Sequence, residues 1–182
     1  RDTTKRGLVK RTQISEFDSI RNNGKKAIIL KDDDELVAVR KTDGTKEIII
    51  GASNGKAVRF VETEIRVMGR GSSGVKGIEL GDDDIVIGSE DVNDNEEILI
   101  VTENGYGKKT GVENYRLTHR GSKGVATLKE TDKNGRLVAL RGIIGEKDVL
   151  IVSDTGITIR INSQQISTLG RNTQGVKLIN LK

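Results

Sequence analysis

The stretch VTENGYGKKTGVENYRLTHRGSKGV, residues 101–125, decides the fold. An apolar segment ends at Asn104-Gly105, a basic segment follows, and the stretch closes in a glycine-rich basic loop. Asn-Gly after an apolar run is typical of a tight β-hairpin turn of type I′, in which both central residues need a positive φ. The stretch therefore predicts two antiparallel strands followed by a loop that carries positive charge.

This pattern occurs four times. Successive turn glycines are 48, 50 and 51 residues apart, and successive loop glycines are 50, 50 and 51 residues apart. A period of this length built from strands indicates a bladed, propeller-like array. We predict a single domain over 1–182, with repeats at approximately 1–46, 47–97, 98–147 and 148–182. The turn glycines are Gly7, Gly55, Gly105 and Gly156, and the loop glycines are Gly24, Gly74, Gly124 and Gly175.

Each full repeat is predicted to hold four strands, with a basic loop before the third and an acidic turn before the fourth. The first repeat has no apolar segment before its turn, and the last stops after its third strand, so both ends are expected to be cut from a longer array. The predicted count is three, four, four and three strands, about fourteen in all. We expect an open arc, monomeric or weakly dimeric, with a short turn near 162–167. The segments before the turns are 47–53, 98–103 and 149–154, and the last strands are 35–40, 84–90 and 136–141.

Composition narrows the class of protein. Hydrophobic residues make up 34% and aromatic residues 2% of the 182 residues, so the core must consist of Ile, Val and Leu, which suits β-structure. The absence of cysteine excludes disulfides and thiolate metal sites, and a single histidine argues against a histidine metal site. No apolar run approaches the length of a membrane span and no signal peptide opens the chain, which predicts a cytoplasmic protein.

Positions held in register divide into core and basic residues. Two sets of large apolar residues are predicted to form the core: Phe17, Ile65, Tyr115 and Ile166, and Ile28, Ile78, Leu128 and Ile179. A basic residue follows each turn glycine by four positions, and we interpret such an in-register basic residue as surface. The predicted polyanion-binding residues are Lys10, Arg11, Arg21, Lys26, Arg59, Arg70, Lys76, Lys108, Lys109, Arg120, Lys123, Arg160, Arg171 and Lys177.

Basic residues that recur in register form rows of positive charge, which indicate binding to DNA or another polyanion. The phosphates along a duplex form a matching row of negative charge, and a protein can bind them without recognising the base sequence. Glycine in the loops would let backbone N–H groups approach a phosphate closely. Solvated charges that protect strand edges from aggregation are the alternative interpretation. It is the better one for a single arginine but not for two basic positions repeated in register.

Other candidate chemistry is weaker. The acidic turns at 32–35 and 82–84 offer carboxylates for Mg²⁺ or Ca²⁺, but they lack the spacing of a calcium loop, and Asp is an ordinary turn residue. We interpret them as marking the face turned away from nucleic acid. His119 has no in-register partner and is expected to be a loop residue or phosphate contact. No catalytic constellation, phosphate-binding loop motif or metal motif is present, so no enzyme activity is predicted for this stretch.

The repeats resemble the C-terminal domain of the A subunit of bacterial DNA gyrase over essentially the whole chain. The resemblance rests on 51–80, 101–125 and 153–181, and most specifically on the repeated Arg-x-x-x-Gly-Val-x-x-Ile/Leu element. It implies an all-β pinwheel of four-stranded blades that exchange strands with their neighbours and wrap DNA with a right-handed sense on a basic outer rim. In the whole enzyme this wrapping supports ATP-dependent negative supercoiling.

The same resemblance implies partners and limits. The partners are double-stranded DNA, the rest of the gyrase A protein and the gyrase B protein, with no membrane and no small-molecule substrate. The DNA-cleaving tyrosine, ATP and Mg²⁺ act elsewhere in the parent enzyme, so this stretch holds no cofactor. The family heptad QRRGGKG is absent, RGSKG at 120–124 being a reduced echo of it, and four repeats stand where the family has six. Without the heptad, the resemblance implies that DNA still binds but that full wrapping and supercoiling are impaired.

Two alternatives stay open. The matching domain of topoisomerase IV shares the fold but has more degenerate repeats, so the regular loops here favour gyrase. A propeller-like scaffold for protein partners is the other alternative; it would bind in a salt-insensitive way and would not need basic residues in register.

Overall fold

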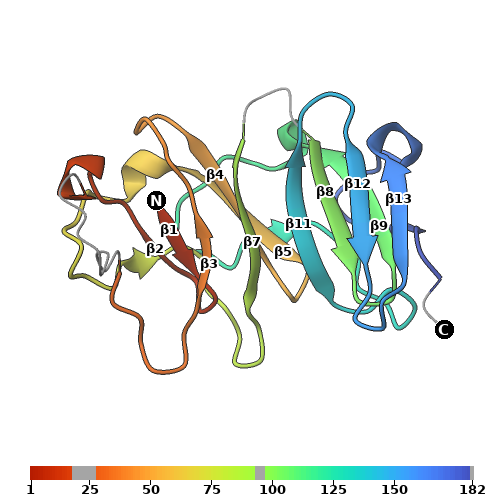
Figure 1. The fold of residues 1–182 in the computed structure, drawn as a ribbon, viewed down its shortest axis with the longest axis horizontal. Helices are drawn as coiled ribbons and strands as arrows, with labels where there is room; N and C mark the ends of the chain where they lie inside the picture. The colour runs from red at the N-terminus through yellow and green to blue at the C-terminus, as the bar shows by residue number, and fades with distance from the viewer. Residues whose placement is uncertain (18–27, 93–96, 181–182) are drawn as a thin grey trace.

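The structure is a computed structural model and describes residues 1–17, 28–92 and 97–180. These residues form three four-stranded antiparallel sheets and one two-stranded sheet. Figure 1 shows the sheets following one another along the long axis, with the first sheet and the two-stranded sheet at opposite ends. The predicted all-β pinwheel of about four blades that stays open is confirmed.

The described residues contain fourteen strands, the predicted total, and one 3-10 helix per repeat. The strands are β1 (Asp2–Thr4), β2 (Leu8–Lys10), β3 (Leu36–Val39), β4 (Glu47–Ala52), β5 (Lys56–Val61), β6 (Val75–Lys76), β7 (Val86–Val92), β8 (Glu97–Thr102), β9 (Tyr106–Gly111), β10 (Val125–Ala126), β11 (Leu137–Ile143), β12 (Asp148–Val152), β13 (Thr158–Asn162) and β14 (Val176–Lys177). The 3-10 helices are η1 (Ile14–Phe17), η2 (Glu62–Glu64), η3 (Val112–Asn114) and η4 (Ser163–Gln165), and η4 confirms the short turn predicted near 162–167.

The first repeat differs from its prediction. It does have a strand before its turn, β1, which the sequence concealed because Asp-Thr-Thr is polar. This strand forms because it pairs with β2 on one side and β3 on the other, and all three of its residues are buried. The third strand expected in this repeat falls largely outside the described residues.

Each four-stranded sheet combines two successive repeats. The strand orders are β3-β1-β2-β6, β7-β4-β5-β10 and β11-β8-β9-β14, so the last strand of each sheet comes from the following repeat. In the second sheet, Val125 of β10 pairs with Ala57 of β5. This strand exchange joins neighbouring repeats through backbone hydrogen bonds, as the family resemblance implied.

The hairpin turns are not of type I′. No residue other than glycine has a positive φ among the described residues, so neither Asn54 nor Asn104 can be the first central residue of such a turn. Instead Gly55 N donates to Ala52 O at 3.0 Å, and Gly55 itself is left-handed at φ +82°. This geometry fits a three-residue loop, a type I turn followed by a left-handed glycine. The glycine is placed as predicted, but the turn is one residue longer than predicted.

The loop glycines are required by the neighbouring backbone. Gly74 has φ +94°, and a Cβ there would lie 2.5 Å from Val9 O on the second strand of the preceding repeat. Gly175 has φ +79°, and its Cβ would lie 2.8 Å from Gly107 O. A side chain at either position would push the exchanged strand away from its sheet. The structure thus gives these glycines a packing role, which differs from the phosphate-binding role that the sequence suggests.

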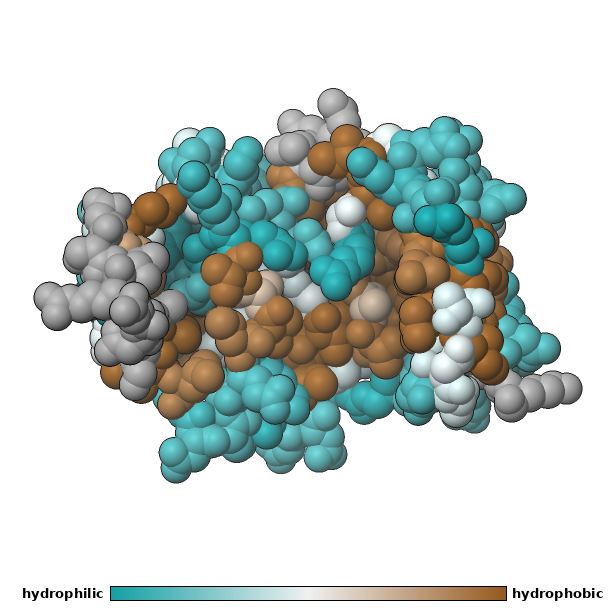
Figure 2. Space-filling view, in the orientation of Figure 1, coloured by the Kyte–Doolittle hydropathy of each residue, from teal (hydrophilic) through white to brown (hydrophobic). Residues whose placement is uncertain are grey.

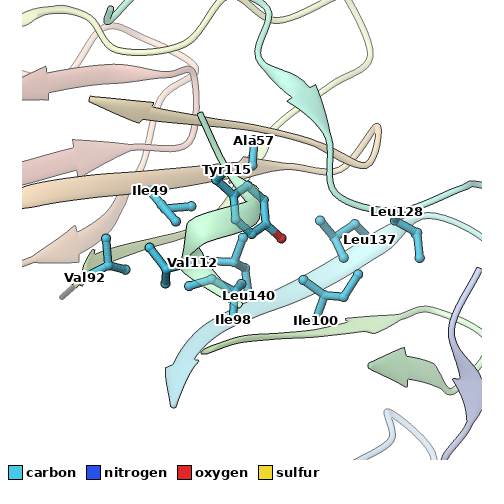
Figure 3. Packing of buried hydrophobic residues seen from close by; sticks show 10 residues of the cluster. All are labelled: Ile49, Ala57, Val92, Ile98, Ile100, Val112, Tyr115, Leu128, Leu137 and Leu140. Atoms are coloured by element: carbon cyan, nitrogen blue, oxygen red, sulfur yellow. The ribbon is translucent and has the colours of Figure 1, made fainter. Parts of the chain in front are cut away.

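The predicted apolar core is confirmed for seven of its eight residues. Ile65, Tyr115 and Ile166 are at most 2% exposed, and all four residues of the second set are buried. Tyr115 packs among Ile49 and Ala57 of the second sheet and residues of the third sheet, so the core lies between sheets (Figure 3). Phe17 is only half-buried, because the structure describes no sheet before β1 for it to pack against.

The two edges of the sheets differ in character. β7 lies against both β3 and β11, so the last strands of neighbouring repeats form an inner edge, and β6, β10 and β14 lie at the outer edge. Figure 2 shows a hydrophobic band across the face on which the inner edge lies, where Leu36, Val39 and Val138 are exposed. Of the residues in β3, β7 and β11, only Arg141 is basic. The outer edge is therefore the better candidate for binding a polyanion.

Candidate nucleic-acid interface

Five exposed basic residues lie at the outer edge, and other exposed basic residues, such as Lys41 and Lys133, lie elsewhere. We call β6, β10 and β14, with the loops that lead into them, the rim (66–76, 116–126 and 167–177). Lys76, Lys123 and Lys177 are exposed there. Arg66 and Arg116 are exposed as well, at the start of the first two loops. Three of these five residues are among the predicted binding residues.

The basic row that follows the turn glycines is not a continuous surface stripe. The side chains of Arg59 and Lys109 are 11% and 9% exposed, whereas that of Arg160 is 77% exposed. Arg59 donates through Nη1 to Val112 O at 3.2 Å and to Tyr115 O at 3.0 Å, both in the following repeat. The interpretation of the row as surface is therefore wrong for Arg59 and Lys109: the Arg59 side chain binds the following repeat, and the Lys109 side chain is buried beside the adjacent strand.

The other three members of the row each have a different partner. Arg11 donates through Nε to Ile65 O at 2.6 Å, the position in register with Tyr115. Lys109 forms an ion pair with Glu97 at 3.6 Å on the adjacent strand. Arg160 lies in the two-stranded sheet, 4.0 Å from Asp148, and no following repeat covers it in the described chain.

A first testable prediction concerns this contact. We expect Arg59→Lys to lower the free energy of unfolding by about 1–3 kcal/mol, because a single Nζ lacks the planar fork by which Arg59 reaches Glu47 through Nε and the two carbonyls through Nη1. Urea denaturation measures the change. The matched control is Arg160→Lys, in the same register but exposed, for which we expect a change within about 0.5 kcal/mol. Equal losses in the two variants would show that Arg59 does not hold the repeats together.

The loop arginines also join repeats. Arg120 donates to Glu64 O at 3.2 Å and to Lys76 O at 3.0 Å, both in the preceding repeat. Arg171 makes the equivalent bonds to Asn114 O at 2.6 Å and Ala126 O at 2.7 Å. Both are half-buried, so their guanidinium groups are shared between the protein and the rim surface.

Lys10 and Lys108 do not lie on the surface as predicted. Both are completely buried, and each ammonium donates to backbone carbonyls of the next repeat's loop. Arg70 is half-buried, and its N–H lies 3.4 Å from Glu16 Oε1. The two remaining predicted residues, Arg21 and Lys26, lie outside the described residues.

A basic hollow opens on the rim of the second sheet. It has a volume of about 260 Å³, and its lining includes Arg59, Arg116, His119, Lys123 and Gly124. None of its lining residues is acidic, although Arg59 is paired with Glu47 and His119 with Glu64 beside it, so Arg116 and Lys123 are the exposed cations that it offers. His119 is a loop residue, as expected; its ring Nδ1 lies 3.2 Å from Glu64 Oε2.

Arg66 and Arg116 are rim residues that the sequence interpretation missed. Each follows its turn glycine by eleven positions, so the two are in register with each other. The other two repeats have Asp18 and Ser167 at this position, and this register was not compared in the sequence interpretation. A register comparison that accepted two of four repeats would have found them.

The acidic turns have structural partners. Asp34 Oδ1 accepts hydrogen bonds from Arg6 N and Glu35 N, both at 2.9 Å. Asp84 accepts from Asn54 and forms an ion pair with Arg136. Among the described residues, no group of three or more His, Cys, Asp or Glu side chains is placed to hold a metal ion. In that part of the chain there is also no helix with the length and hydrophobicity needed to cross a bilayer.

Known proteins share both the sequence and the fold. A family model described as DNA gyrase C-terminal domain, beta-propeller, matches residues 3–43, 46–93, 96–142 and 147–182. The A subunit of DNA gyrase from Halalkalibacterium halodurans is 61% identical over 176 residues, which are 97% of this chain and 21% of that protein. The same protein of Ureaplasma parvum is 49% identical over 180 residues, 99% of this chain and 21% of that protein. The chain thus spans about a fifth of the length of these curated relatives.

Solved structures agree on the fold. The C-terminal domain of DNA topoisomerase IV matches with a TM-score of 0.93 at 26% identity, covering 98% of this chain and 56% of that one. The DNA gyrase A C-terminal domain matches with a TM-score of 0.86 at 27% identity, covering 100% of this chain and 61% of that one. These two likenesses do not separate gyrase from topoisomerase IV, whereas the family model and the sequence relatives do. Because that model matches all four repeats and nearly the whole chain, the chain belongs to the DNA gyrase C-terminal domain family.

Proposed function

We propose that this domain binds double-stranded DNA along the rim and wraps it in support of ATP-dependent negative supercoiling by gyrase. The observation that carries this proposal is that five exposed basic residues lie on the outer edges of three successive sheets. Phosphates recur along a duplex, and cations that neutralise them release counterions, which drives binding without reading the bases. The five residues are Arg66, Lys76, Arg116, Lys123 and Lys177.

The basic hollow supports the same proposal. Arg116 and Lys123 line it as exposed residues, and Arg59 lines it with its guanidinium already bound to backbone carbonyls. Arginine and lysine side chains beside open backbone suit a phosphate oxygen. We therefore place one phosphate of the bound duplex in this hollow, with its neighbours against Lys76 and Lys177.

The remaining predicted residues take an indirect part in this proposal. Arg11 and Arg59 hold successive repeats together, so their replacement would disturb the spacing of the rim before it removed a DNA contact. DNA cleavage, ATP and Mg²⁺ belong to other parts of the gyrase A and gyrase B proteins in the proposal, and this domain acts by binding alone.

Binding to a duplex of about 40 base pairs across a salt series tests the proposal. If the rim engages roughly four to eight phosphates, the slope of log K against log salt should be about −4 to −7. Replacing four rim residues with glutamine should reduce the steepness by about 4, since each phosphate bound contributes about 0.9. Among the described residues the side chains of these four make no hydrogen bond or ion pair, so the fold should persist. The changes are Lys76→Gln, Arg116→Gln, Lys123→Gln and Lys177→Gln.

The matched control removes the same charge elsewhere. Lys41→Gln, Lys133→Gln, Arg141→Gln and Lys147→Gln alter exposed residues outside the rim, and either quadruple variant lowers the net charge from +4 to 0. We expect the control to keep nearly the full slope. Equal slopes in the two variants would refute the rim as the binding surface. Absence of binding even at low salt would favour the protein scaffold instead.

A further inference from the structure

Lys10 and Lys108 are the two lysines with no exposed surface among the described residues. They share one register, three residues after the turn glycine, where repeats two and four have Val58 and Ile159. A buried ammonium costs free energy unless it is fully hydrogen-bonded. Because an apolar residue stands in the same place in the other two repeats, the strand itself does not require a lysine there.

The ammonium groups are bound by the loop of the following repeat. Lys108 Nζ donates to Gly170 O and Arg171 O, both at 2.7 Å, and to Thr173 O at 3.1 Å and Thr173 Oγ1 at 2.8 Å. Lys108 forms no ion pair within the described part of the chain. Its positive charge is therefore compensated by carbonyl dipoles and one hydroxyl, all from a single loop.

Lys10 makes the same arrangement in the first repeat. Its Nζ donates to Arg70 O at 2.7 Å and Ser72 O at 3.0 Å. Arg70 corresponds to Arg171 and Ser72 to Thr173, since each pair lies the same distance before its loop glycine. Because the same contact occurs in two repeats, we interpret it as a repeated structural feature of the domain.

The bound loops are rim loops. Arg171, whose carbonyl binds Lys108, extends its side chain to Ala126 O at 2.7 Å on β10, and β14 with Lys177 follows a few residues later. Several carbonyls of one loop converge on Nζ, and without a cation these dipoles would repel one another. The ammonium therefore fixes the conformation of the loop that carries Arg171 and leads to Lys177.

We propose that Lys108, and Lys10 in the same way, is a positioning residue of the DNA-binding rim, whose buried ammonium holds the next repeat's loop in its binding shape. This inference rests on the proposed function only where it concerns DNA. The loop at 120–124 has Val58 in the corresponding register and lacks such a donor. The rim thus alternates between two clamped loops and one unclamped loop, which carries the basic hollow.

The contact between the Lys108 ammonium and the loop of the fourth repeat, which we call the clamp, depends on pH because Lys108 can lose its proton. Burial first, and then the positive charge of Arg171, lower the pKa of Lys108 from 10.5 to about 8. The other groups facing Nζ are carbonyls and the Thr173 hydroxyl, which do not titrate in this range. Above pH 8 the folded protein releases this proton while the unfolded chain keeps it up to about pH 10.5. The unfolded chain then binds more protons, so overall stability rises with pH between these values. Opening the loop returns Lys108 to water and requires it to take up this proton, so the closed loop should also gain stability over the same range.

Hydrogen exchange in the whole 182-residue chain, read by mass spectrometry at pH 7, tests the proposal. Lys108→Met keeps the unbranched apolar stem of the side chain and removes the ammonium with its donors. We expect the backbone amides of 170–175 to exchange about tenfold faster, with β8 unchanged. We also expect DNA affinity to fall, with a salt slope shallower by about 1 for each phosphate that the rim no longer binds.

The matched control is Val58→Met, which places the same side chain in the same register without removing a donor. Equal exchange of 170–175 in both variants would overturn the proposal, whatever the DNA result. Because exchange is measured without DNA, it also separates this proposal from that of DNA binding. If the rim binds no DNA but the loop loosens in Lys108→Met alone, the clamp stands and the DNA function fails.

The wild-type chain supplies a second measurement if Lys108→Met does not fold. The ¹³Cε resonance of Lys108 should titrate near pH 8, and amide exchange in 170–175, corrected for its intrinsic pH dependence, should slow over the same range because opening the loop then requires proton uptake. A titrating Lys108 beside a loop whose corrected exchange stays constant would overturn the clamp.

Discussion

Gly105→Ala should lower the free energy of unfolding by more than about 4 kcal/mol, the largest single-residue effect we expect in this domain. Gly105 has φ +84°, and an added Cβ would press into Ile179 O and lie 2.7 Å from Ile179 Cγ2. Gly105 O also accepts hydrogen bonds from Leu178 N at 2.8 Å and Ile179 N at 3.2 Å. The substitution would therefore separate the end of the fourth repeat from the third sheet. Urea denaturation followed by circular dichroism measures the loss.

Gly156→Ala is the matched control. Gly156 occupies the same turn position in the fourth repeat with φ +89°, but no atom of the described residues lies within 4 Å of its added Cβ. Only the strain of the left-handed conformation remains, which costs about 1–2 kcal/mol. The difference between the two variants isolates the close approach of the neighbouring repeat. Equal losses would mean that backbone conformation alone explains the repeated glycine.

Tyr115→Ala is the second large effect, with an expected loss of about 3–5 kcal/mol. Tyr115 is 1% exposed and packs between the second and third sheets, and its hydroxyl forms a hydrogen bond with Thr127 (Figure 3). Removing the ring would leave a cavity between the sheets and an unpaired buried hydroxyl. Because the sheets meet through this cluster, we expect the urea transition to broaden as their unfolding becomes less cooperative.

Tyr106→Ala serves as control, since Tyr106 is the only other tyrosine and is only half-buried at the start of β9. We expect a loss of about 1 kcal/mol or less. With no tryptophan in the chain, tyrosine fluorescence follows either variant through the one remaining ring. A small loss in Tyr115→Ala would show that the sheets are held together mainly by strand exchange and loop contacts.

The repeat, the strands and the core were predictable because each depends on local chemistry held at a fixed period. Glycine before each basic strand marks the turn, since its left-handed conformation is a property of one residue. An apolar residue that recurs in register, such as Ile78, is core because exposure would cost free energy in every copy. The polar strand β1 was not predicted, because it forms only by pairing with β2 and β3 and not through an apolar pattern of its own.

The residues that we propose bind DNA were harder to predict, because the sequence does not show which way a charged side chain points. Lys108, Arg59 and Lys123 are all basic and all near a glycine, yet the first is buried, the second binds carbonyls of the next repeat, and the third faces solvent. Which carbonyl meets which cation depends on strand exchange between repeats, which brings together residues that lie about one repeat apart in the chain.

The sequence by itself therefore determined the period, the strand order within a repeat, the apolar core and the family, because these follow from turn chemistry and burial at fixed spacing. Only the tertiary structure decided which basic residues are buried between repeats and which are exposed. The exchanged strands leave carbonyls that need donors, and Arg59, Lys10 and Lys108 are bound to them. Five of the exposed residues lie at the outer edge, and these are the ones that we propose bind DNA.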